Sequence, residues 1–146
     1  MKLSSNHTYI FIIKLVAIVH IVLGMLLPFL AQTEIVASQL VDAMFIDIAL
    51  SHEAHLQAAY IIALFGPTVA SWGILLLVLF LSFIESPSKQ KWLGLIAAVL
   101  VWYIGDSIYS LINGVATAFL LNSLVAISLL MPLWKLRKLT REKNTF

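Results

Sequence analysis

The chain has 146 residues, of which 62% are hydrophobic and 11% are charged, and its mean hydropathy is +1.02. A soluble domain is about half apolar and about a quarter charged, so this composition excludes a soluble globular protein. The absence of cysteine excludes disulfide bonds, thiol redox chemistry and thiolate metal sites. The net charge of +2 gives no reason to expect a nucleic-acid partner, because the placement of the basic residues reports membrane topology instead.

Four stretches are long and apolar enough to cross a bilayer, and we predict them at about 9–31, 58–84, 92–112 and 115–134. The last two are joined in a run of 43 residues whose single charge is Asp106. As one helix this run would measure about 64 Å, twice the roughly 30 Å of a hydrocarbon core. It must therefore reverse, and Asn113-Gly114 has the turn chemistry for a tight hairpin.

The basic residues lie at the two ends of the chain and between spans two and three. They are Lys2, Lys14, Lys89, Lys91, Lys135, Arg137, Lys138, Arg141 and Lys143. The positive-inside rule then places both termini in the cytoplasm. The fold expected from the sequence is an all-α integral membrane protein, an antiparallel bundle of four transmembrane helices in a single membrane domain over 1–146.

Residues 33–50, between the first two spans, have the pattern of an amphipathic helix on the extracytoplasmic side. Its apolar face comprises Val36, Ala37, Leu40, Val41, Met44 and Ile48, and Ser38, Gln39 and Asp42 lie opposite. Such a helix can lie on the membrane surface or cover the bundle, and the sequence does not choose between the two.

The second span carries a seam of small residues at spacings of 4, 3, 4 and 3: Ala59, Ala63, Gly66, Ala70 and Gly73. Small residues let membrane helices approach closely where lipid supplies no hydrophobic drive. Pro67 follows Gly66 on this helix and predicts a bend with a freed carbonyl near mid-membrane.

Asp106 is the residue that a plain bundle explains least. A carboxylate at membrane depth costs a few kcal/mol, so it is expected to face the bundle or a wet cavity. On a helical wheel Trp102, Tyr103, Tyr109, Ser110 and Asn113 fall within about 60° of it. This polar and aromatic stripe predicts either a proton-binding or ligand-binding site in the outer leaflet, or hydrogen bonding between helices that only stabilises the bundle.

Three histidines are further candidates for chemistry. His20, near the middle of the first span, is interpreted as a proton relay, a haem ligand or a neutral core residue. His52 and His55 stand at i and i+3, a spacing that lets two imidazoles share a metal, although no third ligand is assured. If spans two and three pack together, these two histidines would converge with the Asp106 stripe.

The layout of one span, an extracytoplasmic insert and three closely spaced spans resembles the DoxX-like and BphX-like small four-helix membrane proteins. The features that carry the resemblance are Gly73, Gly105-Asp106, Gly114 and the closing segment Leu130-Met131-Pro132-Leu133-Trp134. The resemblance implies a multi-pass accessory protein of the bacterial inner membrane, sometimes near redox systems, and transfers no functional residue.

No sequence motif identifies a reaction, so we favour a non-enzymatic accessory or small-ligand-binding module whose polar site surrounds Asp106. Its partners would be the lipid bilayer and either a second copy or another membrane protein, with no cofactor. One alternative is an oligomeric proton-coupled transporter or channel that uses Asp106. Another is a redox subunit that binds haem or a divalent metal through His20 with His55 or His52. A toxin-binding immunity protein fits the size equally well.

Overall fold

The computed structural model describes residues 3–45 and 50–142, which are helical apart from short connections. The helices are α1 (Leu3–Leu30), α2 (Glu34–Met44), α3 (His52–Glu85), α4 (Lys89–Ile112), α5 (Ala116–Leu136) and the single turn α6 (Leu139–Glu142). By length and composition α1, α3, α4 and α5 can each cross a membrane. They correspond to the four predicted spans, and the chain is therefore a multi-pass membrane protein.

Two of the long helices begin before the apolar stretches, because serine caps them. The Ser51 side chain accepts a hydrogen bond from the Ala54 amide at 3.3 Å, so α3 starts at His52 and not at 58 as predicted. The Ser88 side chain likewise accepts from the Lys91 amide at 3.2 Å. A capping hydroxyl satisfies an amide that the first turn leaves without a helical partner, so hydropathy alone placed both starts too late.

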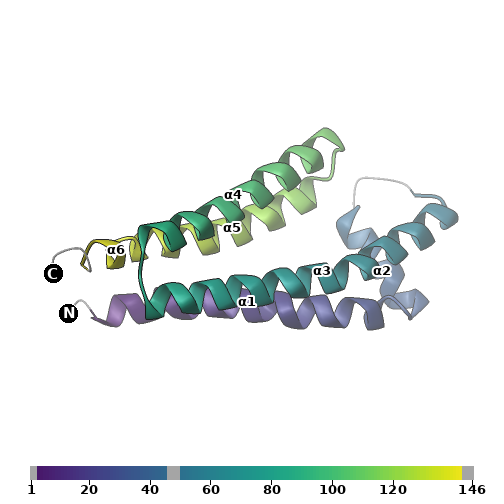
Figure 1. Cartoon of the computed structure of the whole chain (residues 1–146). Helices are drawn as coiled ribbons and strands as arrows, with labels where there is room; N and C mark the ends of the chain where they lie inside the picture. The colour runs from purple at the N-terminus through teal and green to yellow at the C-terminus, as the bar shows by residue number, and fades with distance from the viewer. Residues whose placement is uncertain (1–2, 46–49, 143–146) are drawn as a thin grey trace.

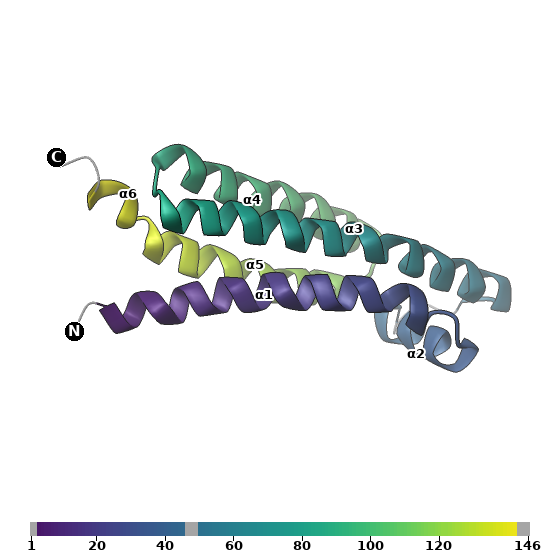
Figure 2. The ribbon, with the colours of Figure 1, turned by 60° about the horizontal axis from the view of Figure 1, so that its bottom comes forward.

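The long helices are arranged as two pairs, α1 beside α3 and α4 beside α5 (Figures 1 and 2). The described ends of the chain lie at one end of the molecule, which we call the terminal end. The pairs pack together there and separate toward the opposite end, which we call the far end (Figure 1).

Glycines bring α1 and α3 into backbone contact, which confirms the predicted small-residue seam. Gly66 on α3 is buried, and a Cβ added to it would lie 2.5 Å from the Gly24 carbonyl oxygen on α1. Pro28 has no N–H to bond that carbonyl four residues earlier in the helix. The freed oxygen instead lies against the α-carbon side of Gly66, the arrangement in which weak Cα–H···O contacts recur between closely packed helices.

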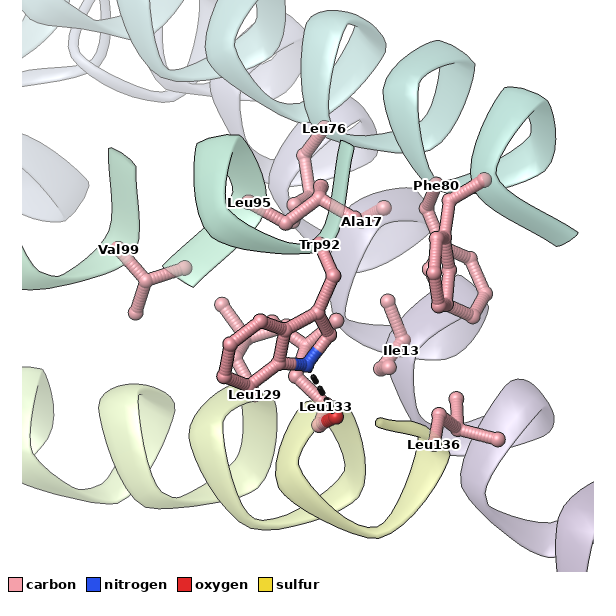
Figure 3. Packing of buried hydrophobic residues seen from close by; sticks show 11 residues of the cluster. Ile13, Ala17, Leu76, Phe80, Trp92, Leu95, Val99, Leu129, Leu133 and Leu136 are labelled. Atoms are coloured by element: carbon pink, nitrogen blue, oxygen red, sulfur yellow. Dashed lines mark hydrogen bonds between the residues drawn. The ribbon is translucent and has the colours of Figure 1, made fainter. Parts of the chain in front are cut away.

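The core joining the two pairs is at the terminal end (Figure 3). It contains Ile13, Ala17, Leu76, Phe80, Phe83, Trp92, Leu95, Val99, Leu129, Leu133 and Leu136. Trp92 of α4 donates its indole N–H to the Leu133 carbonyl of α5 at 2.8 Å. That carbonyl is free because the Arg137 amide bonds to Trp134 instead, as α5 tightens at its end.

The far end is organised by α2, which packs against α3. Val41 is fully buried and packs with Ala37 against Ala59, and the polar Ser38 and Asp42 are exposed. The predicted amphipathic helix is confirmed over 34–44, and it packs against α3 of the bundle. Predicted Ile48 of its apolar face lies outside the described residues.

The hairpin between α4 and α5 occurs at Asn113 and Gly114 as predicted. Only Gly114 adopts positive φ, at 71°, while Asn113 stays at −93°. The glycine therefore supplies the left-handed residue that the reversal requires.

The α1–α3 contact predicts a strong effect of a single methyl group at Gly66. Gly66→Ala would force the Gly24 backbone away, and overpacking of this kind costs about 1–3 kcal/mol. We expect a lower melting temperature in detergent. Gly105→Ala is the matched control, because a Cβ there meets nothing within 4 Å, and its melting temperature should be unchanged or higher. Equal melting temperatures for the two variants would contradict the seam.

Candidate functional site

A pocket of about 700 Å³ lies at the far end, between the last turns of α1, the helix α2 and the first turns of α3. Its lining residues are Pro28, Ala31, Gln32, Ala37, Ser38, Leu50, His52, His55, Leu56, Ala59, Tyr60 and Ala63. The volume is within the range of about 300–1,000 Å³ that small-molecule sites occupy. Mostly apolar walls with a few polar groups are also typical of such sites.

Short side chains account for the space between these helices. Four of the lining residues are alanines, and two of them, Ala59 and Ala63, continue the small-residue seam of α3 toward the far end. At Gly66 and Gly73 the seam lets α1 touch α3. Closer to the far end, α1 ends at Leu30 and the chain turns into α2. The same run of small residues therefore makes a contact at one level and a hollow at the next.

One hydrogen-bonded pair ties α2 to the start of α3 at the pocket. The Nε2–H of His55 donates to a carboxylate oxygen of Asp42 at 2.8 Å, and the two side chains are 25% and 62% exposed. The Ser51 cap begins the helix that carries His55, so a local sequence signal positions the imidazole. A pair this exposed contributes only about 0.2–1 kcal/mol, which is enough to bias the position of a short helix.

His52 and His55, predicted as metal ligands, both line this pocket. The Nε2 of His55 is already bonded to Asp42. Across residues 3–45 and 50–142, His, Asp and Glu side chains do not gather in any group of three that would hold a metal ion. The metal site at this position stays a prediction, and the third ligand it needs does not come from the described residues.

His20 belongs to a second site, in the membrane-spanning part of the molecule. Its ring lies 4.9 Å from that of Trp72 on α3, and Trp72 lies 5.4 Å from Trp102 on α4. We call His20, Trp72 and Trp102 the aromatic ladder. The Nδ1–H of His20 donates to the Val16 carbonyl at 2.7 Å, the geometry expected of the hydrogen-bonding core histidine that the sequence offered as one alternative.

The residues of the predicted Asp106 stripe point in different directions. Tyr103 faces α5, where its hydroxyl donates a hydrogen bond to the Ser123 hydroxyl oxygen at 3.1 Å. Tyr103 is the donor because Ser123 donates its own hydroxyl hydrogen to the Phe119 carbonyl of α5. Tyr109 is 71% exposed, and the Asn113 side chain donates to the Tyr109 carbonyl at 2.8 Å. The stripe is therefore divided between the contact with α5 and the outer surface of α4.

Asp106 is exposed, so the bundle does not bury it, and the other expected surrounding, a wet cavity, stays a prediction. Asp106 follows Trp102 by one turn on the same face of α4, the face that meets α3 at the aromatic ladder. The two helix pairs diverge toward the far end (Figure 1), the direction in which Asp106 follows Trp102 along α4.

The aromatic ladder and the pocket are two separate sites. The aromatic ladder meets α3 at Trp72, 17 residues after His55, which corresponds to about 25 Å along the helix. His20 therefore cannot share a haem iron with His52 or His55, because both axial ligands bind the same atom.

Trp72 and the alanines of the pocket are the site residues that sequence reasoning missed. Trp72 precedes Gly73 of the predicted seam, so its position beside the α1 contact was a usable signal. The pocket had no such signal, because alanine at helical spacing also describes ordinary close packing.

Comparisons with protein-family models, with curated protein sequences and with solved structures found no match to this chain.

The Asp42 to His55 contact predicts how firmly α2 closes the pocket. The chain has no cysteine, so Val41→Cys introduces a unique thiol at a fully buried position. We expect Asp42→Asn to speed maleimide labelling of that thiol by up to about fivefold, the effect of losing an exposed pair. Gln39→Ala, an exposed change on the same helix, should leave the rate unaltered. If Asp42→Asn also leaves the labelling rate unaltered, the Asp42 to His55 pair does not hold α2.

Proposed function

We propose that this protein is a non-enzymatic membrane protein that binds a small amphipathic molecule in the pocket between α1, α2 and α3. The observation that carries the proposal is the pocket itself, about 700 Å³ in volume and roofed by a separate short helix. Apolar walls would hold the body of such a molecule, and the polar groups of Gln32, Ser38 and His52 would contact its polar end.

The position of the pocket supports a ligand that comes from the membrane or its surface. The flanking helices expose large apolar side chains there, among them Phe29, Leu56 and Tyr60. We propose that this surface contacts lipid at the membrane boundary, because exposed apolar patches of this kind mark sites of membrane contact. An amphipathic molecule would reach the pocket with its apolar part in the lipid phase and its polar part at the headgroups.

We further propose that both termini are cytoplasmic and that the pocket opens on the extracytoplasmic side of a bacterial inner membrane. The arrangement of charge supports this orientation. The described basic side chains include Lys89, Lys91, Lys135 and Arg137, all at or beside helix ends at the terminal end. An accessory role is also what the resemblance to DoxX-like and BphX-like proteins implies, and that resemblance is part of the proposal.

Filling the pocket tests the binding proposal. We expect non-denaturing mass spectrometry of the purified wild type to show a retained small molecule, and Ala63→Phe to lose it, because a phenyl ring would occupy the pocket. Ala97→Phe places the same ring on the exposed surface of α4 and should retain the molecule. A wild type that carries no added mass, or equal retention in both variants, would refute the proposal.

Single cysteines test the orientation, since the natural chain contains none. In intact bacterial cells a membrane-impermeant maleimide should label Gln39→Cys on α2 and Asn113→Cys at the hairpin. Lys138→Cys should be labelled only after the membrane is permeabilised. Labelling of Lys138→Cys in intact cells would reverse the orientation and place the pocket in the cytoplasm.

A further inference from the structure

We propose that Asp106, with the tryptophans of the aromatic ladder, forms a binding site for lipophilic organic cations that enter from the outer leaflet. This site is separate from the pocket between α1, α2 and α3, so cation binding is tested independently of that pocket, and only its assignment to the outer leaflet rests on the proposed orientation. It names a ligand class for the one acidic residue that lies well inside a membrane-spanning helix.

Asp106 lies on α4 about 22 Å beyond Lys91, which places its carboxylate within the membrane-spanning length of the helix. In the described residues its carboxylate has no hydrogen bond or ion pair, and Lys and Arg side chains lie at the terminal end. A carboxylate at this depth requires a proton or a cation as partner. None of the described Lys and Arg side chains is placed there, so a charged Asp106 would take its cation from outside the described part of the chain.

Two tryptophan rings, one from α4 and one from α3, lie on the surface next to Asp106. Trp102 precedes Asp106 by one turn on the same face of α4. Its ring lies 5.4 Å from that of Trp72, and the two rings are tilted relative to each other. Both tryptophans are only half-buried, so part of their ring surface is accessible. A cation placed over an indole face is attracted by the negative π-surface, most strongly where water is absent. Carboxylate and tryptophan together favour an organic cation over a metal ion, which would need several oxygen or nitrogen ligands.

A ligand reaches Asp106 past the exposed side chains of α3 and α4. Toward the far end from Trp72 the same face of α3 carries Thr68 and Phe65, both of which are exposed, Phe65 by 60%. Asp106 on α4 is exposed as well, and the two helix pairs diverge toward the far end (Figure 1). Side chains exposed within a membrane-spanning helix face the hydrocarbon region, where a molecule with a large apolar surface partitions. A small hydrated cation would not partition there.

Tetraphenylphosphonium is the probe that tests this site. Equilibrium dialysis of the purified full-length chain in a nonionic detergent should show saturable binding of the radiolabelled cation. Asp106→Asn should weaken binding by at least about tenfold, because it removes the charge that pairs with the ligand in a desolvated site. Glu85→Gln, an equally conservative change at an exposed acid of α3 near the terminal end, should bind as the wild type does.

Three further measurements separate the site from a general effect on folding or partitioning. Asp106→Glu keeps the charge and should retain binding. Trp102→Leu keeps the carboxylate but should bind several-fold less tightly, because the cation loses an aromatic face. Tetraphenylmethane, a neutral molecule of the same shape, should not compete. The proposal is overturned by an absence of saturable binding, by Asp106→Asn binding as tightly as the wild type, or by competition from tetraphenylmethane.

Discussion

The backbone contact between Gly24 and Gly66 is the constraint on which the rest of the structure depends. It makes α1 and α3 one unit, because each glycine occupies space that a Cβ on the other would need. Lipid is as apolar as the side chains it contacts, so close backbone packing is one of the few forces that associate helices in a membrane. α1 ends at Leu30, while α3 extends further toward the far end, and α2 packs beside this extension of α3 and leaves the pocket.

The pair α4 and α5 is attached to this unit mainly at the terminal end. Trp92 completes the hydrogen bonding of α5 through the Leu133 carbonyl, and the Arg137 guanidinium lies over both Trp92 and Trp134 at 5.2 and 5.3 Å. Further along, the aromatic ladder is the contact between α3 and α4, and beyond it the pairs separate. The pairs diverge toward the far end, where α5 still contacts α2, and Asp106 of α4 is exposed.

The two candidate sites have different origins in the same fold. The pocket forms where small residues continue beyond the end of α1, so its walls are mostly apolar and its polar groups come from α2 and the start of α3. The Asp106 site forms where two helix pairs part, so it is open to lipid and has one strong charge beside aromatic rings. A molecule suited to one is therefore poorly suited to the other.

The sequence by itself determined the four spans, the hairpin at Asn113-Gly114, the helix after the first span and the α3 seam, because hydropathy, turn chemistry and helical spacing act locally. It also singled out His52 and His55, which line the pocket, but not the pocket itself. Only the tertiary structure decided that Trp72 joins His20 to Trp102, that Asp106 is exposed and that His20 lies far from His52 and His55. Those outcomes depend on how closely the helix pairs pack at each level, which no single helix encodes.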